Sequence, residues 1–562
     1  MAKILITSAL PYVNGVKHLG NLVGSLLPAD VHARFRRQIG DEVLFICSTD
    51  EHGTPAELGA LQAGQDVRAF CDAQHAIQAD IYRRFGLSFD HFGRTSASQN
   101  HALTQHFYRR LDAAGLIEER DVRQIWSAVD RRFLPDRYVL GTCPHCGFEQ
   151  ARGDQCDGCG ALLDPPELIG PRSSLSGDTS LEIRQSQQLF LRQSLLVEKL
   201  SAWLESRNGW PPFVISLAKS WLAGELRDRC ITRDLAWGVA VPRTGFEQKV
   251  FYVWFDAPIG YIAATQEWAE AHHRDWREWW WNAGDVKYIQ FLGKDNVPFH
   301  TVSFPATLLG SREPWKTVDV IKGFHWLNYH GGKFSTSRGR GIFTDQALQE
   351  LPADYWRWWL IANAPETSDT DFNTGRFVAD VNKDLADTFG NLVNRIVSFT
   401  HQAFDGRTPC GGEPSTQETS LAAELDQRIA ALRTFHEACE FRRAAAETRA
   451  IWSAANAYLQ HAAPWTEIKS DSARAAVVTR TGLNLVRLSA VLAWSIIPAL
   501  AEAVLRAFGE DQAIPRWPCG PVGALLNGGA GQSVLRLDPL VVKITREKAS
   551  HLAARFGEQD GA

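Results

Sequence analysis

Two short segments of the chain combine residue types that suit phosphate chemistry. The first, His18-Leu19-Gly20-Asn21, follows a Pro/Tyr/Asn/Gly turn where an apolar run gives way to a helical pattern. A helix N-terminus offers free N–H groups and the positive end of a dipole to phosphate. His18 could donate to phosphate oxygens, and Gly20 would let a nucleotide approach the backbone closely. An ordinary histidine at the start of a helix would give the same pattern.

The second segment, Lys333-Phe-Ser335-Thr336-Ser-Arg338-Gly, lies some 300 residues later. A lysine followed by small hydroxyl residues and glycine is typical of a mobile phosphate-handling loop. Lys333 and Arg338 could neutralise the charge that builds on departing pyrophosphate. An ordinary polar surface turn is the alternative.

A third pattern consists of two Cys-x-x-Cys pairs, Cys143/Cys146 and Cys156/Cys159. Each pair can present two thiolates to one tetrahedral Zn²⁺, and four such ligands make a closed structural site. The sequence predicts one structural zinc ion, with His145 as a bystander. Free thiols or a redox pair are the alternative. The six other cysteines are scattered, which favours reduced thiols over a disulfide framework.

Aromatic and acidic residues gather in loops that follow predicted strands. A pocket for a linear apolar amino acid needs apolar walls and one carboxylate for the ammonium group. Asp50 could supply the carboxylate, although each aromatic residue taken alone is more often part of a core than of a pocket. The candidate wall residues are Leu10, Tyr12, Trp254, Ala257, Pro258, Tyr261 and His300.

A last set lies in the helical C-terminal part of the chain. Asn391 and Arg395 are four positions apart and therefore share one helix face. Trp465 follows Pro464 at a helix break, where its ring could project outward and stack on a base. A solvated arginine and a core tryptophan would look alike.

The elements that must position these residues follow an α/β pattern. Apolar runs at 3–8, 43–47, 250–254 and 288–292 predict strands of a parallel sheet covered by helices on both faces. Residues 116–245, between the second and third runs, instead contain the cysteine cluster and several Gly/Pro turns. This difference predicts one α/β domain split by an insertion. The two halves of the α/β domain are predicted at 1–115 and 246–325, with the insertion at 116–245 between them. A stem-contact region that carries the lysine loop is predicted at 326–378 and a helical domain at 379–535. The last unit, 536–562, is predicted to hold a C-terminal helix that begins near 539.

Composition narrows the functional classes. The 562 residues carry a net charge of −5, so any RNA binding must be local. The N-terminal apolar run is short and no small-residue cleavage site follows, which favours a buried first strand over a signal peptide. The apolar segment 483–505 contains Arg487, Pro498 and Glu502, so we expect a core helix and not a membrane span. We expect a cytoplasmic protein.

The His18 and Lys333 segments, separated by the predicted split α/β domain, resemble the two signature motifs of class I aminoacyl-tRNA synthetases. The segments that carry the candidate pocket residues resemble those of the methionyl-tRNA synthetase family. The resemblance covers almost the whole chain. The resemblance implies catalysis by His18, Asn21, Lys333 and Thr336, and a methionine pocket built from Asp50 and the wall residues named above. It implies ATP contacts from Pro11, Tyr12, Gly20, Asn21, Gly293, Asp295, Lys333, Ser335 and Thr336.

Further expectations follow from the same resemblance. It implies anticodon contacts by Asn391, Arg395 and Trp465, and an arginine, Arg233, beside the amino-acid site. Magnesium would accompany ATP, the partners would be tRNA(Met), ATP and L-methionine, and the protein would be a monomer. Thr336 departs from the family pattern, which usually has a second lysine there. The alternatives are a paralogue that activates an amino acid without charging tRNA, and a catalytically silent RNA-binding protein.

Overall fold

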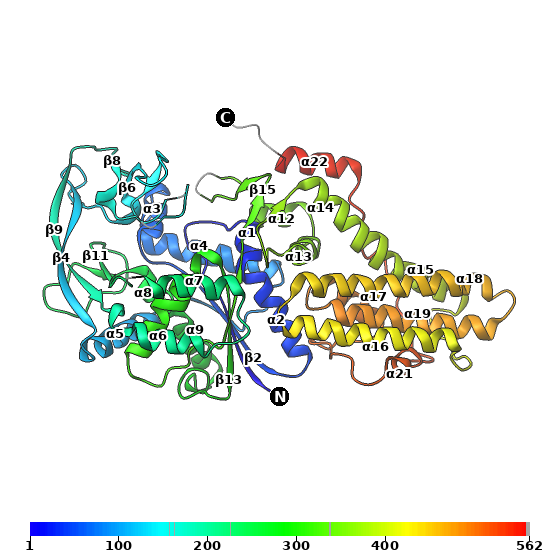
Figure 1. Ribbon diagram of the computed structural model, residues 1–562. Helices are drawn as coiled ribbons and strands as arrows, with labels where there is room; N and C mark the ends of the chain where they lie inside the picture. The colour runs from blue at the N-terminus through cyan, green and yellow to red at the C-terminus, as the bar shows by residue number, and fades with distance from the viewer. Residues whose placement is uncertain (157, 162, 225, 337–338, 558–562) are drawn as a thin grey trace.

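The chain folds into a catalytic part with an insertion and an elongated helical part, as Figure 1 shows. We describe a computed structural model, in which residues 1–156, 158–161, 163–224, 226–336 and 339–557 are described. Residues Ser337 and Arg338 of the lysine loop lie outside them, so the role predicted for Arg338 is not addressed. Strands from residues 3–94 and 286–324 form the sheet that positions the candidate site.

A five-stranded parallel sheet forms the centre of the catalytic part, in the order β14-β13-β1-β2-β3. Its strands are rich in β-branched and aromatic residues, and most of these are buried on both faces, as a covered parallel sheet requires. The sequence therefore predicted the fold class and the strands at 3–8, 43–47 and 288–292 correctly. The bounds are β1 (Lys3–Ser8), β2 (Glu42–Thr49), β3 (His91–Arg94), β13 (Val286–Gly293) and β14 (Val320–Phe324).

The strand predicted at 250–254 is mostly wrong. Only Val250–Phe251 is extended, as β12, which pairs with β11 (Thr232–Arg233). The next residues form a helical turn, α8 (Val253–Asp256), in which the Phe255 N–H donates to the Tyr252 carbonyl at 2.8 Å. A short apolar run fits a buried strand and a buried helical turn equally well, so periodicity could not separate them.

Helices cover both faces of the sheet. Two of them open with π-helical segments, η1 (Leu22–Leu26) and η6 (Phe299–Ser303), each followed directly by a helix with proline in its first turn. A proline inside a helix clashes with the carbonyl four residues earlier, and a wider local turn relieves that clash. The helices are α1 (Leu19–Asn21), α2 (Leu27–Gln38), α3 (Thr54–Gln62), α4 (Val67–Arg84), α5 (Ser98–Ala113), α9 (Gly260–His272), α10 (Arg277–Trp280) and α11 (Phe304–Gly310).

The insertion leaves the sheet after α5 and forms the left edge of the view in Figure 1. Its arm is a long antiparallel pair, β4 (Ile117–Ser127) with β9 (Leu181–Leu191), joined at its edges by β5 (Arg132–Phe133) and β10 (Arg229–Cys230). A small sheet of β6 (Val139–Thr142), β7 (Ala151–Arg152) and β8 (Ile169–Ser173) carries the four clustered cysteines at its turns. Two helices, α6 (Val197–Glu205) and α7 (Pro212–Ala223), lead back towards the sheet.

The lysine loop follows the sheet and belongs to a hairpin, β15 (Leu327–Tyr329) with β16 (Gly332–Lys333). β17 (Thr370–Phe372) completes this small sheet, and α12 (Thr344–Glu350) and α13 (Ala353–Ala362) pack beside it. Arg357 of α13 is fully buried and ties the two parts of the molecule together. Its guanidinium donates to Asp30 of α2 at 2.6 Å and to the Ile496 carbonyl of the helical part at 2.8 Å.

The helical part is a bundle that extends to the right in Figure 1. Helix α19 is long and apolar enough to cross a membrane, but 94% of its most apolar window is buried inside the structure. The predicted core segment 483–505 is thus the end of α19 and most of α20, with Pro498 starting the second helix. The bounds are α14 (Thr374–Val381), η7 (Asn382–Gly390), α15 (Asn391–Ala403), α16 (Thr416–Glu437), α17 (Phe441–Ala462), α18 (Pro464–Glu467), α19 (Ser472–Ala493), α20 (Pro498–Ala507) and α21 (Val522–Leu526).

The last helix, α22 (Arg546–Phe556), begins seven residues later than the sequence predicted. Pro539 and the β-branched pair Val541-Val542 disfavour a helix in the preceding irregular segment, and the Thr545 hydroxyl accepts the Lys548 N–H at 3.2 Å to cap the helix. The helix packs beside α14, away from the bundle tip. There the carbonyl of Phe556 accepts the Tyr329 hydroxyl of β15 at 2.6 Å.

Candidate active site

His18 caps the first helix after β1. Its Nδ1 accepts the Asn21 N–H at 3.2 Å, and the Asn21 side-chain oxygen accepts the His18 N–H at 3.3 Å. Because Nδ1 is an acceptor, the proton of the neutral ring lies on Nε2. Burial, together with the charge of Lys17, lowers the pKa of His18 to about 3. The ring is therefore a neutral Nε2–H donor at physiological pH.

The lysine loop closes over this histidine. The ring of Phe334 stacks on the His18 ring, with centroids 4.8 Å apart, and backbone bonds between Ser335 and Arg340 form a tight hairpin. Gly341 has a φ of +130° and passes so close to Phe334 that an added Cβ would lie 2.2 Å from that ring. Gly20 is less tightly constrained, because a Cβ there would lie 3.0 Å from His18 Nδ1 and 3.4 Å from Phe334. Glycine at these positions lets loop and helix meet.

A cavity of about 510 Å³ lies between the sheet, the lysine loop and the cysteine-bearing turns, and we call it the nucleotide cavity. It brings together most of the residues to which the sequence assigned ATP contacts, from both ends of the catalytic part. Thr336 is not among its lining residues, and neither is Tyr12. The predicted residues that line it are Leu10, Pro11, His18, Gly20, Asn21, Gly293, Asp295, Lys333 and Ser335.

Lys333 reaches the nucleotide cavity from strand β16. Its ammonium lies 4.2 Å from the ring centroid of Trp326, and the ammonium of Lys294 lies 3.8 Å from the same ring. Cation–π contact of this kind holds a lysine without removing its charge. Lys333 is exposed, so its charge remains available to an anion in the cavity.

The predicted amino-acid pocket residues lie beside the nucleotide cavity. The Tyr261 hydroxyl donates to His300 Nε2 at 3.0 Å, while His300 Nδ1 donates to the Asn296 carbonyl at 2.9 Å. Burial lowers the pKa of His300 to about 4, so this ring is also neutral. Trp254 stacks on Phe299 at 3.7 Å and meets Tyr12 edge to face at 6.4 Å.

Other residues complete these walls. Leu10 contacts the start of α9 near Gly260, and Ala257 is buried in the turn before it. Pro258 lines a small cavity of about 10 Å³ together with Trp254 and Phe299. The aromatic side chains thus fill most of the predicted pocket in this conformation.

Asp50 follows β2 and forms a backbone bridge with Tyr12, one of the predicted pocket residues. It is 7% exposed, and its Oδ1 has no hydrogen-bond partner among the described residues. Burial and the neighbouring carboxylate of Asp256 raise its pKa well above the ordinary value. A buried carboxylate without a partner is costly, so a cationic group in the pocket would be strongly favoured here. Lys17, which the sequence analysis missed, is buried nearby and donates to Asn14 at 2.8 Å.

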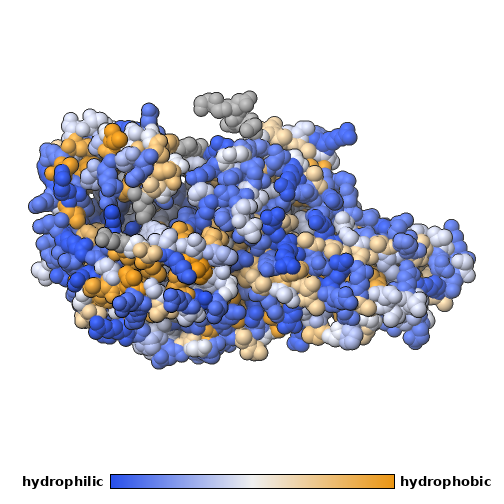
Figure 2. Space-filling model, viewed as in Figure 1, coloured by the Kyte–Doolittle hydropathy of each residue, from blue (hydrophilic) through white to orange (hydrophobic). Residues whose placement is uncertain are grey.

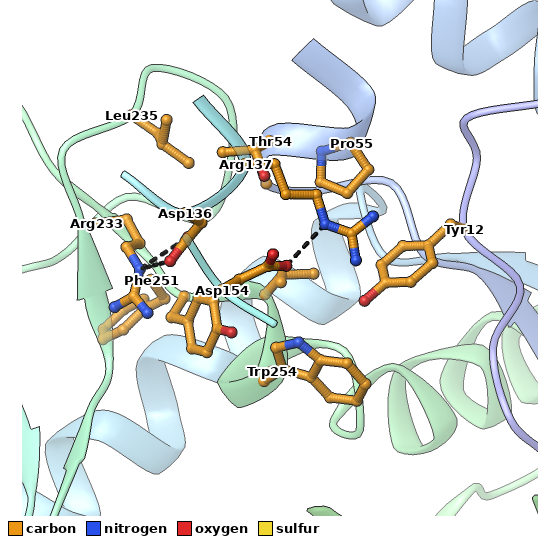
Figure 3. Close-up of a pocket in the computed structure, with 13 residues that line it drawn as sticks. Tyr12, Thr54, Pro55, Asp136, Arg137, Asp154, Arg233, Leu235, Phe251 and Trp254 are labelled. Atoms are coloured by element: carbon orange, nitrogen blue, oxygen red, sulfur yellow. Dashed lines mark hydrogen bonds and ion pairs between the residues drawn. The ribbon is translucent and has the colours of Figure 1, made fainter. Parts of the chain in front are cut away.

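Figure 3 shows how the insertion joins the pocket. Arg233 pairs with Asp136 at 3.0 Å, and its guanidinium lies 3.8 Å from the ring of Tyr252. Arg137 pairs with Asp154 at 2.7 Å and covers the Tyr12 ring at 5.7 Å. Arg233 therefore lies in the wall next to the amino-acid pocket, held by the insertion.

The four clustered cysteines converge as their spacing predicted. All four Sγ atoms lie within 4.8 Å of one another, and Cys143 and Cys159 are 3.9 Å apart. Tetrahedral Zn–S bonds of about 2.3 Å place sulfurs about 3.8 Å apart, so this set fits a metal ion. Gly147 and Gly160, each directly after the second cysteine of its pair, have φ of +74° and +80° and so need glycine. His145 is outside the set.

The cysteine cluster also faces the nucleotide cavity, which the sequence analysis did not foresee. Phe148, Gln155, Cys156, Gly158 and Gly160 line that cavity. We call the segment from Cys143 to Ala161 the cysteine knuckle. No sequence signal indicated this placement, because it depends on how the insertion arm folds back over the sheet.

The predicted anticodon residues lie on the bundle. The Arg395 guanidinium of α15 covers the ring of Trp465 at 4.5 Å and donates to Gln460 at 3.1 Å. Asn391 lies one turn earlier on the same helix, directly after the π-helical segment η7. All three residues are half-buried, while Phe389, Leu392 and Ile396 form the buried apolar face, as predicted.

Comparison with known proteins agrees with this geometry. Residues 4–397 match the family model of class I tRNA synthetases (M), and residues 408–561 match the anticodon-binding domain of methionyl tRNA ligase. The chain is 56% identical to the methionine–tRNA ligase of Ruegeria sp. (strain TM1040), over 99% of both chains. It is also 56% identical to that of Caulobacter vibrioides (strain NA1000 / CB15N), over 99% of this chain and all of that one.

A solved structure of a related protein also has a similar fold. Mycobacterium tuberculosis methionyl-tRNA synthetase in complex with methionyl-adenylate superposes with a TM-score of 0.77 at 25% identity, covering 96% of this chain and 99% of that one. Full-length identity, the family models and the split parallel sheet all agree. The chain therefore belongs to the methionine–tRNA ligase family of class I aminoacyl-tRNA synthetases.

Proposed function

We propose that the protein activates L-methionine with ATP and transfers the methionyl group to the 3′ end of tRNA(Met). The observation that carries this proposal is the meeting of His18 and Lys333, 315 positions apart in sequence, on one cavity beside an apolar pocket in which Asp50 Oδ1 has no hydrogen-bond partner among the described residues. The neighbour solved with methionyl-adenylate supports the same substrates.

In the first step, the methionine carboxylate attacks the α-phosphate of ATP in line, forming methionyl-adenylate and releasing pyrophosphate. His18, as a neutral Nε2–H donor, and the Lys333 ammonium stabilise the charge that gathers on the phosphates. Asn21 fixes the His18 tautomer, and the Gly293–Asp295 segment and Pro11 hold the nucleotide. Ser335 contributes a hydroxyl donor from the loop, whereas the next residue, Thr336, does not line the nucleotide cavity.

In the pocket, Asp50 binds the substrate ammonium and the walls bind the side chain. The wall residues Leu10, Tyr12, Trp254, Ala257, Pro258, Tyr261 and His300 exclude water, with His300 kept neutral so that it adds no charge. In the second step, the 2′-hydroxyl of the terminal tRNA adenosine attacks the adenylate carbonyl, and AMP leaves.

Two metal ions accompany this assignment. Cys143, Cys146, Cys156 and Cys159 would hold one Zn²⁺, which supplies structure and not Lewis-acid catalysis because no coordination position is open. Mg²⁺ bound to ATP would supply further positive charge to the phosphates. Asn391, Arg395 and Trp465 read the anticodon, and we expect a cytoplasmic monomer.

The test is aminoacylation of total tRNA by the purified protein with radiolabelled methionine, ATP and Mg²⁺. We expect methionine to be attached to tRNA(Met) alone. Adenylate formation without any charged tRNA would instead support the paralogue that ligates a small molecule. Failure of both reactions would support a silent RNA-binding protein and reject the proposal.

A further inference from the structure

The lysine loop carries one cation fewer than the family pattern, because Thr336 occupies the place of the usual second lysine. Threonine can donate a hydrogen bond but carries no charge, and Thr336 does not line the nucleotide cavity. ATP brings several negative charges to such a cavity, and they gather on pyrophosphate as it leaves. The question is which other side chain of the wall could balance them.

Two side chains of the cavity wall carry a positive charge at physiological pH. Among the described residues these are Lys333 and Arg340. His18 and His325 also line the cavity, but burial lowers the pKa of each ring, so neither adds a charge. Figure 2 shows a hollow in this face below the insertion, and hydrophilic surface prevails on the part beside it that carries the lysine loop. Arg340 is therefore the described candidate for the second charge.

Arg340 belongs to the same hairpin as Thr336. The backbones of Ser335 and Arg340 form two hydrogen bonds, of 2.9 and 3.0 Å, which close the hairpin around Thr336. The Arg340 guanidinium lies against Gly332, where an added Cβ would be only 2.6 Å from Nη2. Glycine thus leaves room for this guanidinium beside the residue that precedes Lys333. A lysine at position 336 and the arginine at position 340 would therefore bring charge to the cavity from one loop.

The charge of Arg340 is available to an anion. Its Nη2 donates to the carbonyls of Tyr329 and His330 at 3.0 and 3.5 Å, and the residue is exposed. A guanidinium has five N–H donors, so these two bonds leave others for a phosphate. Among the described residues, Lys294 pairs with Asp369 at 2.7 Å, whereas Arg340 is paired with no carboxylate.

We propose that Arg340 is a catalytic residue, which binds the leaving pyrophosphate and supplies the positive charge that Thr336 lacks. The inference rests on the proposed function, because adenylate formation is the step that releases pyrophosphate. In that step a methionine carboxylate oxygen bonds to the α-phosphorus. The bond from this phosphorus to the oxygen that bridges to the β-phosphate breaks, and its electron pair stays on pyrophosphate. Arg340 neither gains nor loses a proton; its N–H groups donate to the oxygens on which charge increases.

Arg340→Gln is the most direct variant, because it removes the charge and keeps an N–H donor for the Tyr329 carbonyl. We expect methionine-dependent ATP–pyrophosphate exchange at saturating ATP to slow roughly 100-fold, the usual effect of losing one preorganised donor. Arg340→Lys should show an intermediate rate, because it keeps the charge but not the guanidinium fork. The matched control is Arg376→Gln on α14, an exposed arginine outside the cavity, which should exchange normally.

Thr336→Lys in the Arg340→Gln background separates a charge contribution from a structural one. A lysine at position 336 cannot replace the bonds from Arg340 to the Tyr329 and His330 carbonyls, but it can return a cation to the loop. The double variant should recover most of the lost exchange rate, whereas Thr336→Lys alone should change the wild-type rate little. The same pair of variants made with Arg338→Gln tests the arginine that the sequence indicated for this role.

Each contrary result has a distinct meaning. Normal exchange by Arg340→Gln would overturn the proposal, and so would loss and recovery in the Arg338→Gln background alone. Slow exchange that Thr336→Lys does not relieve would also overturn it and limit Arg340 to holding the hairpin. In all these cases the wild-type protein still exchanges with methionine, so the proposed function stands. Wild-type protein without methionine-dependent exchange would reject the proposed function itself.

Discussion

At the scale of single residues, the chemistry depends on the protonation state of His18. Its Nδ1 accepts a backbone N–H and burial lowers its pKa to about 3, so the ring is neutral with its proton on Nε2. A neutral donor of fixed direction suits a phosphate whose charge changes during the reaction. The sequence located this residue by its place after a strand, but the tautomer depends on the side chain and backbone of Asn21.

We predict that His18→Ala and Lys333→Ala each slow adenylate formation about 100- to 1,000-fold, the usual effect of removing one preorganised donor. Methionine binding should change little, because neither side chain lines the aromatic pocket. Stopped-flow or exchange kinetics at saturating methionine measure the effect, with the exposed His272→Ala as control. Near-normal exchange in either variant would remove that residue from the transition state.

The positions of Thr336 and Phe334 in the structure could not be predicted from their residue types. Thr336 stands where the family usually has a second lysine, yet it does not line the nucleotide cavity. Phe334 carries no chemistry in the sequence pattern, but it stacks on His18 and holds the loop closed. Its contribution follows from a contact between segments more than 300 positions apart, which no local pattern contains.

At the scale of elements, the cysteine knuckle joins metal binding to the nucleotide cavity. Its Cys156, Gly158 and Gly160 line that cavity, so disorder of the knuckle would remove part of the wall. The sequence predicted the cysteine cluster and its tight turns correctly, because both depend on local spacing. It did not predict the wall, because that depends on the long β4–β9 arm.

We predict that removal of the bound metal by a chelator raises the KM for ATP several-fold and lowers the unfolding temperature of the insertion. Cys146→Ser should have the same effect, and Zn²⁺ should restore the chelated wild type but not the variant. The exposed Cys519→Ser, far from the cluster in sequence, serves as control. Unaltered ATP kinetics in a metal-free protein would contradict a structural contribution of the knuckle to this cavity.

The bundle elements give a second prediction. Arg395 covers the Trp465 ring, and both belong to the predicted anticodon surface formed by α15 and α18. Trp465→Ala and Arg395→Ala should each reduce kcat/KM for tRNA charging about 10-fold or more, through lost stacking, with pyrophosphate exchange unchanged. Arg433→Ala on the exposed side of α16 is a suitable control. Equal charging by all variants would reject this surface.

Element boundaries differed in how well the sequence predicted them. Strands β1, β2 and β13 were located because long apolar, β-branched runs bury both faces of a parallel sheet. The run at 250–254 failed because the Tyr252 carbonyl accepts the N–H groups of Phe255 and Asp256 at 2.8 and 3.3 Å, which starts the helical turn α8 after two extended residues. The start of α22 was missed because an irregular segment with Pro539 and β-branched residues precedes its cap.

At the scale of the whole molecule, buried polar side chains join the catalytic part to the bundle. Arg357 bridges α2, α13 and the turn after α19. His436, on α16, stacks on Phe35 of α2 at 4.8 Å and is 1% exposed. Burial lowers the pKa of His436 to about 3. These side chains make the relative position of the two parts sensitive to acid.

The sign of that sensitivity follows from proton linkage. The unfolded state binds a proton at His436 near pH 6.5, whereas the folded state does so only near pH 3. Stability from this residue therefore falls as pH drops through that window, by about 1.4 kcal/mol per pH unit below pH 6.5. We predict that His436→Leu shows a smaller loss of stability between pH 6.5 and 5 than wild type, measured by urea unfolding. Parallel slopes in wild type, His436→Leu and the exposed-site control His461→Leu would contradict the assignment.

The central claim is that the nucleotide cavity and the apolar pocket beside it together join ATP to methionine, and ATP–pyrophosphate exchange in the presence of each amino acid separately tests it most directly. We expect rapid exchange with L-methionine alone, because the aromatic pocket excludes polar side chains and Asp50 requires an ammonium group. Exchange that is absent with methionine, or equally fast with an unrelated amino acid, would contradict the account.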